Sequence, residues 1–107
     1  MNIINLTPHA ITFVDENNQI KKVIEPSGNI ARVGATTVTV GELAGIPVTT
    51  TEFGEVIGLP DKTSDTIFLV SSLVAGRVPD RDDVFIPNES VRDDKGRIVG
   101  CKSLGRI

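Results

Sequence analysis

Short hydrophobic segments alternate with turn residues along the whole chain. The segments AITFVD, IKKVIE, TTVTV, TIFLVS, DVFIP and RIVGC are rich in β-branched residues, and Gly, Pro, Asn or Asp separate them at intervals of roughly four to seven residues. This spacing is typical of an all-β fold, because β-branched side chains favour extended backbone and the intervening residues favour turns. Within TTVTV, Val38 and Val40 share one face of the predicted strand while Thr37 and Thr39 share the other, which indicates a half-buried strand.

The turn chemistry predicts three β-hairpins. The first covers residues 11–25 with a turn at ENNQ, the second covers 37–50 with a turn at GELAG, and the third covers 90–101 with a turn at DDKG. In the third turn Gly96 suits a left-handed position.

One short helix is expected after the strand TIFLV. Ser71 or Ser72 can cap a turn of SLVAGRV, and Pro79 ends it within two turns. No other segment sustains a helical apolar period. We therefore expect residues 1–107 to form a single β-rich domain, a compact antiparallel sheet or barrel-like arrangement of short strands and hairpins with one short helical turn.

Composition narrows the classes of function. A net charge of −3 argues against general nucleic-acid binding and against a membrane-surface footprint, since both depend on an excess of Lys and Arg. No segment reads as a signal peptide or a membrane span, so a cytoplasmic protein is expected. The single cysteine, Cys101, predicts a buried reduced thiol, and one Cys with one His cannot assemble a zinc set. Nucleotide-binding glycine motifs are absent from the sequence, so no cofactor is predicted.

Five of the six arginines lie after residue 76, interleaved with aspartates. Guanidinium groups bind phosphate through paired N–H donors, and turns or helix starts add backbone N–H groups. The sequence therefore predicts an anion site, with no catalytic group and no metal ligand. Its candidate ligand-binding residues are Arg32, Arg77, Arg81, Arg92, Ser27, Ser71, Ser72 and His9.

Each candidate also has a structural interpretation that stays open. The arginines can pair with neighbouring aspartates on a solvated surface, and Ser27 can belong to a simple hairpin turn. A serine at a helix start can serve only as an N-cap. His9, in the turn Thr7-Pro8-His9, can hydrogen-bond to backbone instead of a ligand.

Six segments in chain order carry a resemblance to a known group of proteins. They are NLTPHAI, EPSGNIAR, GEVIGLP, TIFLVSSLVAG, RDDVFIP and VRDDKGRIVGC. With these segments the chain resembles, over nearly its whole length, small proteins of no settled activity encoded in bacteriophages and prophages. Small phage proteins include sponges that sequester the cyclic nucleotide or cyclic ADP-ribose signals of bacterial immunity, inhibitors and minor virion components. The chain departs from the group's pattern at Asn88, where a glycine often follows the proline.

Two functions from different classes follow. The first is a non-catalytic protein that binds and sequesters an anionic, nucleotide-derived small molecule of the cyclic nucleotide or cyclic ADP-ribose type. The second is a protein-interaction or assembly module that uses its Arg and Asp surface. A homo-oligomer is expected in both cases, because short strands leave edges that association covers. A ligand pocket requires at least two arginines converging on one concavity without full pairing to Asp.

Overall fold

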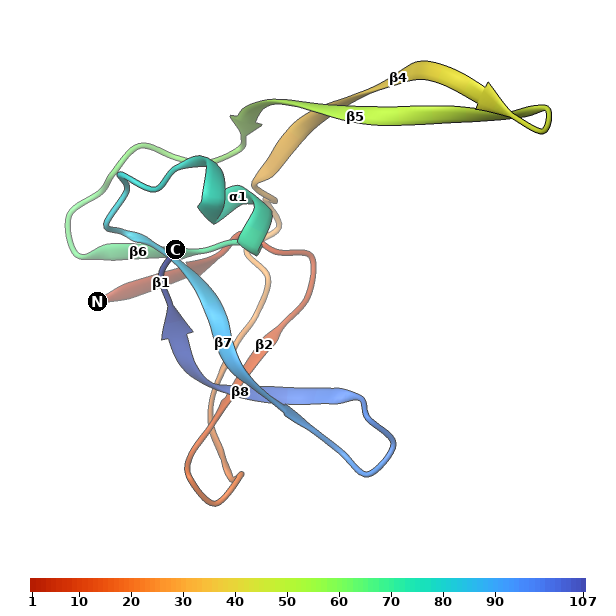
Figure 1. The fold of residues 1–107 in the computed structure, drawn as a ribbon. Helices are drawn as coiled ribbons and strands as arrows, with labels where there is room; N and C mark the ends of the chain where they lie inside the picture. Colours follow the sequence, from red (N-terminus) through yellow and green to blue (C-terminus); the bar gives the residue numbers. More distant parts are fainter.

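The computed structural model describes all 107 residues and contains eight strands and one helix (Figure 1). The strands are β1 (Asn2–Asn5), β2 (Ile11–Val14), β3 (Ile20–Ile24), β4 (Arg32–Leu43), β5 (Ile46–Ile57), β6 (Thr66–Leu69), β7 (Val84–Arg92) and β8 (Ile98–Gly105). The helix α1 covers Ser72–Arg77. The predicted fold class, mostly β with one short helical turn, is confirmed.

Six strands form one sheet in the order β1-β6-β7-β8-β2-β3, and β4 pairs only with β5. The pairs β1–β6, β6–β7 and β2–β8 are parallel, whereas β7–β8 and β2–β3 are antiparallel hairpins. The sheet is therefore mixed, where an antiparallel sheet was expected. Turn residues signal a hairpin locally, but parallel pairs join strands that are separated by long connections and have no local signal.

The side-chain amide of Asn5 joins the two ends of this sheet. Its Oδ1 accepts hydrogen bonds from the backbone N–H and the hydroxyl of Thr7, at 2.9 and 2.6 Å. Its Nδ2 donates to the carbonyl oxygens of His9 and Ile24, at 2.8 and 3.1 Å. The amide is buried with every donor and acceptor position occupied, and the Asn5 backbone forms a parallel bridge with Pro26. The six strands thus form a barrel-like ring in which β1 meets the chain just after β3.

The hydrophobic core lies beneath α1, against β6 and the start of β7. Its members are Leu6, Ala31, Phe68, Val70, Val74, Ala75 and Val84. Only 17 of the 107 residues are buried, so this core is small for a chain of this length. Hydrophobic side chains that the core does not cover remain on the surface, and many of them lie on β4 and β5.

All three predicted hairpins are present. Their turns contain residues with positive φ, at Asn18 (60°), at Ala44 and Gly45 (52° and 81°), and at Gly96 (79°). Two consecutive positive φ values at the β4–β5 turn match the right-handed twist of the strands that it joins. Asn88, where the chain departs from the pattern of the resembled group, lies inside β7 and pairs with Ser103 of β8.

The β4–β5 hairpin projects from the rest of the molecule as an arm, residues 32–57 (Figure 1). Each strand has 12 residues, which corresponds to about 40 Å of extended backbone. Every residue from 39 to 55 is exposed. The radius of gyration is 17.0 Å, whereas a compact domain of this length has about 13 Å. The chain is therefore more extended than the compact domain that was expected, and the arm projects from the remainder, residues 1–31 and 58–107, which we call the body (Figure 1).

The arm has two chemically different faces. Paired residues of a hairpin place their side chains on the same face, and successive residues alternate. The threonine face consists of Thr37, Thr39, Thr49 and Thr51. The aliphatic face carries Val38, Leu43, Ile46 and Val48, together with Thr50, which pairs with Val38. Thr37 and Thr39 share one face and Val38 lies on the other, as predicted, but Val40 has no partner because a bulge lies between Thr39 and Gly41. The predicted burial is wrong beyond Val38, because no other element of the chain covers the aliphatic face; Val40 is 62% and Leu43 71% exposed.

The arm joins the body at Gly58. The φ of Gly58 is +86°, and a Cβ at this position would lie 2.5 Å from the carbonyl oxygen of Ile30, so only glycine fits. At the same end of the arm, the guanidinium of Arg77 in α1 lies 5.3 Å from the ring centre of Phe53 in β5. These contacts hold the base of the arm against the body.

The hydrogen bonds of the buried Asn5 amide lead to a first prediction about stability. Replacing Asn5→Asp removes both N–H donors and leaves a buried carboxylate facing the carbonyl oxygens of His9 and Ile24. We expect the free energy of unfolding, measured by urea denaturation at neutral pH, to fall by about 3 kcal/mol. The exposed Asn29→Asp is the matched control and should change stability by less than about 0.5 kcal/mol. Equal effects of the two substitutions would contradict the role assigned to the amide.

Candidate functional site

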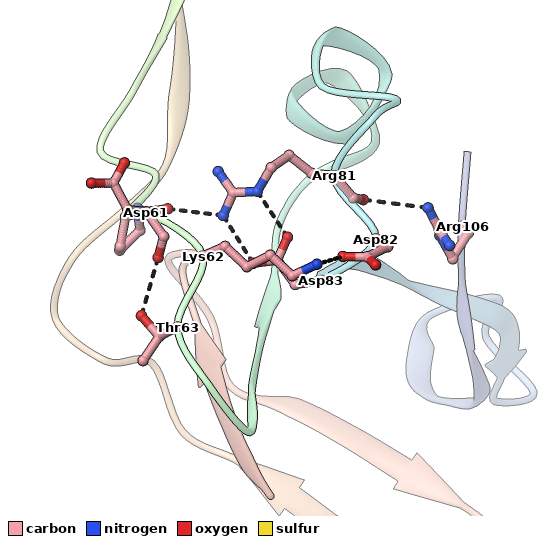
Figure 2. A network of polar contacts seen from close by, with 8 residues as sticks. Asp61, Lys62, Thr63, Arg81, Asp82, Asp83 and Arg106 are labelled. Atoms are coloured by element: carbon pink, nitrogen blue, oxygen red, sulfur yellow. Dashed lines mark hydrogen bonds and ion pairs between the residues drawn. The ribbon is translucent and has the colours of Figure 1, made fainter.

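Arg81 connects the loop after the arm to the start of β7 (Figure 2). Its Nε and Nη2 donate to the two carboxylate oxygens of Asp83, at 2.8 and 2.9 Å. Nη2 also donates to the carbonyl oxygen of Pro60 at 2.9 Å. Lys62 forms an ion pair with Asp82 beside them. Two loops that are distant in the sequence are therefore fastened together by charged groups.

The Arg81–Asp83 pair is largely shielded from water, with side chains 26% and 5% exposed. Hydrogen bonds from Arg81 hold the pKa of Asp83 below its ordinary value, although burial acts in the opposite direction. The same hydrogen bonds raise the pKa of Arg81. Because this fork of N–H donors is engaged by an internal carboxylate, Arg81 has a structural role in this chain.

Two other arginines of the predicted site also have partners within the chain. Arg92 donates from Nη1 to the carbonyl oxygen of Gly96 at 2.7 Å, at the tip of the third hairpin. Arg77 lies over Phe53 at the base of the arm. None of the three main hollows in the surface is lined by two of the predicted arginines. The structure thus does not bring the arginines of the predicted site to one concavity.

The three predicted serines have local positions. The hydroxyl of Ser27 accepts from the backbone N–H of Asn29 at 3.3 Å and lies 3.2 Å from its carbonyl oxygen, within one turn. Ser71 is the N-cap of α1, as predicted, and its hydroxyl accepts from the N–H of Val74 at 3.4 Å. Ser72 is the exposed first residue of the helix.

His9 contributes its backbone and not its ring to the structure. Its carbonyl oxygen accepts hydrogen bonds from Asn5 Nδ2 at 2.8 Å and from the hydroxyl of Thr7 at 3.0 Å. The residue itself is exposed. The NLTPH segment is therefore a turn organised by the buried Asn5, a residue that the sequence analysis did not single out.

Arg32 differs from the other predicted arginines because its guanidinium has no ion pair, no hydrogen bond like that of Arg92 and no aromatic contact like that of Arg77. It lines a hollow of about 250 Å³ together with Ser71, Thr7 and Pro8. The rest of the lining is mainly hydrophobic. Typical small-molecule sites have volumes of about 300 to 1,000 Å³, so this hollow suits only a small group or part of a larger ligand.

A larger groove of about 470 Å³ opens on the surface where β1, β2, β3 and β8 meet, and we call it the lysine groove. The residues that line it include Lys21, Lys22, Lys102, Ile3, Phe13, Val14 and Leu104. No carboxylate lies among the lining residues, and none of the three lysines belongs to an ion pair of the chain. Its surface is thus positively charged with hydrophobic side chains between the charges.

A β-bulge explains why two successive lysines reach this groove. Phe13 pairs with Lys22 and Val14 pairs with Ile20, so Lys21 is an extra residue in β3. A bulge places two residues of one strand opposite one residue of its partner and disrupts the alternation of side chains. Strict alternation in IKKVIE would send the two lysines to opposite faces, and for this reason the sequence analysis did not find the groove.

Cys101 is buried, as predicted. Burial raises the pKa of its thiol, and its Sγ lies 3.6 Å from the carbonyl oxygen of Thr12. No group of three or more His, Cys, Asp and Glu side chains is placed to hold a metal ion. These features give the thiol a packing role.

Comparisons of the chain with protein-family models, with curated proteins and with solved structures found no match. The one helix of the structure, α1, lacks the length and the apolar character that crossing a membrane requires. Function is therefore inferred from the contacts, charges and shape of this chain alone. The unengaged surfaces include the arm, the lysine groove and the hollow at Arg32.

The Arg81–Asp83 pair predicts a pH dependence of stability. When folding lowers the pKa of a carboxyl group, that group stabilises the folded protein at pH values above the pKa that it has in the unfolded chain, about 4. This stabilisation is lost as the pH falls through the lower pKa that the group has in the folded protein. We expect Asp83→Asn to flatten the acid side of the stability profile measured by urea denaturation. Arg81→Ala should cost about 3 kcal/mol at neutral pH, because it leaves a buried carboxylate without its partner.

The exposed Asp94 offers the matched control for this measurement. Asp94→Asn should keep the pH profile of the wild-type protein, since no ion pair is lost. If wild type and Asp83→Asn lose stability in parallel as the pH falls, the pair does not carry the acid sensitivity.

Proposed function

We propose that the protein is a non-catalytic assembly module that forms a homo-oligomer through its arm. The main support for this proposal is the aliphatic face of the arm, which no part of the chain covers. An isolated two-stranded hairpin is only marginally stable in water, and contiguous exposed hydrophobic surface is typical of a binding site. Association with another chain would both bury this face and stabilise the arm.

The edges of the arm support the same proposal. β4 and β5 pair only with each other, so each has one edge with unpaired backbone groups. Such edges are open to pairing with another chain, and soluble proteins usually cover or blunt them. The resemblance to small phage proteins is compatible with this function, because that class includes inhibitors and minor virion components. Our proposal therefore includes that the protein is encoded by a bacteriophage or prophage.

Charge placed on the aliphatic face should weaken the assembly. We expect the wild-type protein to have the mass of more than one chain in size-exclusion chromatography with light scattering, and Leu43→Asp with Ile46→Asp to shift it toward a single chain. Burying one such side chain contributes about 1.5 to 3 kcal/mol, so the dissociation constant should rise at least about 10-fold.

The threonine face provides the matched control. Thr39→Asp with Thr49→Asp introduces the same charge on the other face of the arm, three residue pairs nearer the body than Leu43 and Ile46. This control should dissociate less than the variant of the aliphatic face. A wild-type protein that has the mass of one chain at every concentration would contradict the assembly function.

Capture of a small anionic ligand of the cyclic nucleotide or cyclic ADP-ribose type is a second candidate function. One observation favours it, namely that Arg32 has no ion-pair partner and lines a hollow with Ser71. A single arginine with a hydrogen-bonding neighbour is a weaker site than the converging arginines that the sequence predicted. We therefore rank this function below assembly.

Calorimetric titration tests this second candidate. A panel of cyclic di- and trinucleotides and cyclic ADP-ribose isomers should include one ligand that Arg32→Ala binds about 10- to 150-fold more weakly, the loss expected for one charge-assisted hydrogen bond. The control is Arg97→Ala, which removes only the exposed pair with Asp93. Absence of binding by the wild-type protein to every member of the panel would eliminate this function.

A further inference from the structure

We propose that the arm of one copy docks in the lysine groove of a second copy. The inference rests on the proposed assembly function and names the surface that receives the arm. Two different surfaces of the same chain then meet, so the contact is head to tail and every copy both gives an arm and receives one.

Charge complementarity selects these two surfaces. Between residues 33 and 60 the only charged side chains are Glu42, Glu52 and Glu55. The lysine groove carries three lysines without internal ion-pair partners and no carboxylate. Glu52 lies on the aliphatic face and Glu42, which pairs with Pro47, lies on the threonine face, so an arm that enters the groove brings negative charge on both faces toward three lysines, which favours the encounter of the partners.

Hydrophobic complementarity acts at the same place. Glu52 pairs with Thr36, and this pair lies on the same face of the arm as Val38, so a negative charge borders the aliphatic face. Leu43 and Ile46 end that face at the tip of the arm. The groove offers Ile3, Phe13, Val14 and Leu104 between its lysines, in a volume of about 470 Å³. Both surfaces thus combine hydrophobic side chains with one sign of charge.

The geometry of one chain excludes two simpler arrangements. The arm points away from β2 and β8, which line the groove, so a chain does not fill its own groove (Figure 1). Face-to-face pairing of two arms would bring glutamates together with no basic residue on either arm beyond Arg32 at its base, and like charges across an interface are unfavourable. The groove of another copy is the surface that satisfies both charge and hydrophobic contact.

Charge reversal on each surface and on both surfaces together tests the docking. One variant carries Lys21→Glu, Lys22→Glu and Lys102→Glu, and a second carries Glu42→Lys, Glu52→Lys and Glu55→Lys. We expect each to raise the dissociation constant of the oligomer at least about 10-fold in analytical ultracentrifugation, because like charges then face each other. The chain with all six substitutions should return to within about threefold of wild type, since attraction is restored with the signs exchanged.

The control is Lys95→Glu, because Lys95 is an exposed lysine at the tip of the third hairpin, outside both surfaces. This substitution should leave the dissociation constant unchanged. If the lysine-groove variant assembles like wild type while Leu43→Asp with Ile46→Asp dissociates, the arm is an assembly element but the groove is not its receptor. Failure of the six-fold variant to recover also overturns the docking. A calorimetric titration with inorganic pyrophosphate covers the remaining outcome. If the wild-type protein binds pyrophosphate, the lysine-groove variant does not, and both assemble alike, the docking is overturned and the groove is a site for a small anion.

Discussion

The buried side-chain amide of Asn5 is the constraint on which the shape of the body depends. The sheet is weakly joined elsewhere, since β6 and β7 share two residue pairs and β2 and β8 share one. Asn5 adds four hydrogen bonds between β1, the turn at Thr7 and His9, and the end of β3. Buried polar groups of this kind favour one arrangement because any other leaves them unpaired. Without this closure β1 would be connected to β2 and β3, with which it lines the lysine groove, only through the other strands of the sheet.

The charged residues divide into two groups with different consequences. Arg81 and Asp83 are engaged with each other and fasten the loop that follows the arm, so their charge chemistry serves the single chain. Lys21, Lys22 and Lys102 have no such partners and are available to another molecule. An arginine-rich segment was the more conspicuous feature of the sequence, yet the unpaired lysines form the stronger candidate for recognition. Local charge density alone does not distinguish the two groups, because both contain basic residues near the surface.

Local chemistry predicted the local structure and little beyond it. The hairpin turns, including Gly96, and the N-cap at Ser71 follow from residue types that favour one backbone conformation. The mixed sheet depends on parallel pairing between strands that are distant in the sequence, and no short segment predicts such a pair. The lysine groove depends on the bulge at Lys21, which the residue types of β3 do not predict. The predicted anion site gathered residues by chemical type, and the fold placed Arg81 and Arg92 beside partners of their own.

The close contact at Gly58 has a consequence for the symmetry of any assembly. Because the backbone of Gly58 packs against the carbonyl group of Ile30, the direction in which the arm leaves the body is determined by the chain itself. In a head-to-tail contact, the rotation from one copy to the next is the angle between the two docking surfaces of a single chain. A rotation that divides a full circle evenly closes into a ring, and any other rotation continues as a helical filament. If the proposed head-to-tail contact forms, the geometry of one glycine and its neighbour would thus contribute to the number of subunits, far from the surfaces that touch.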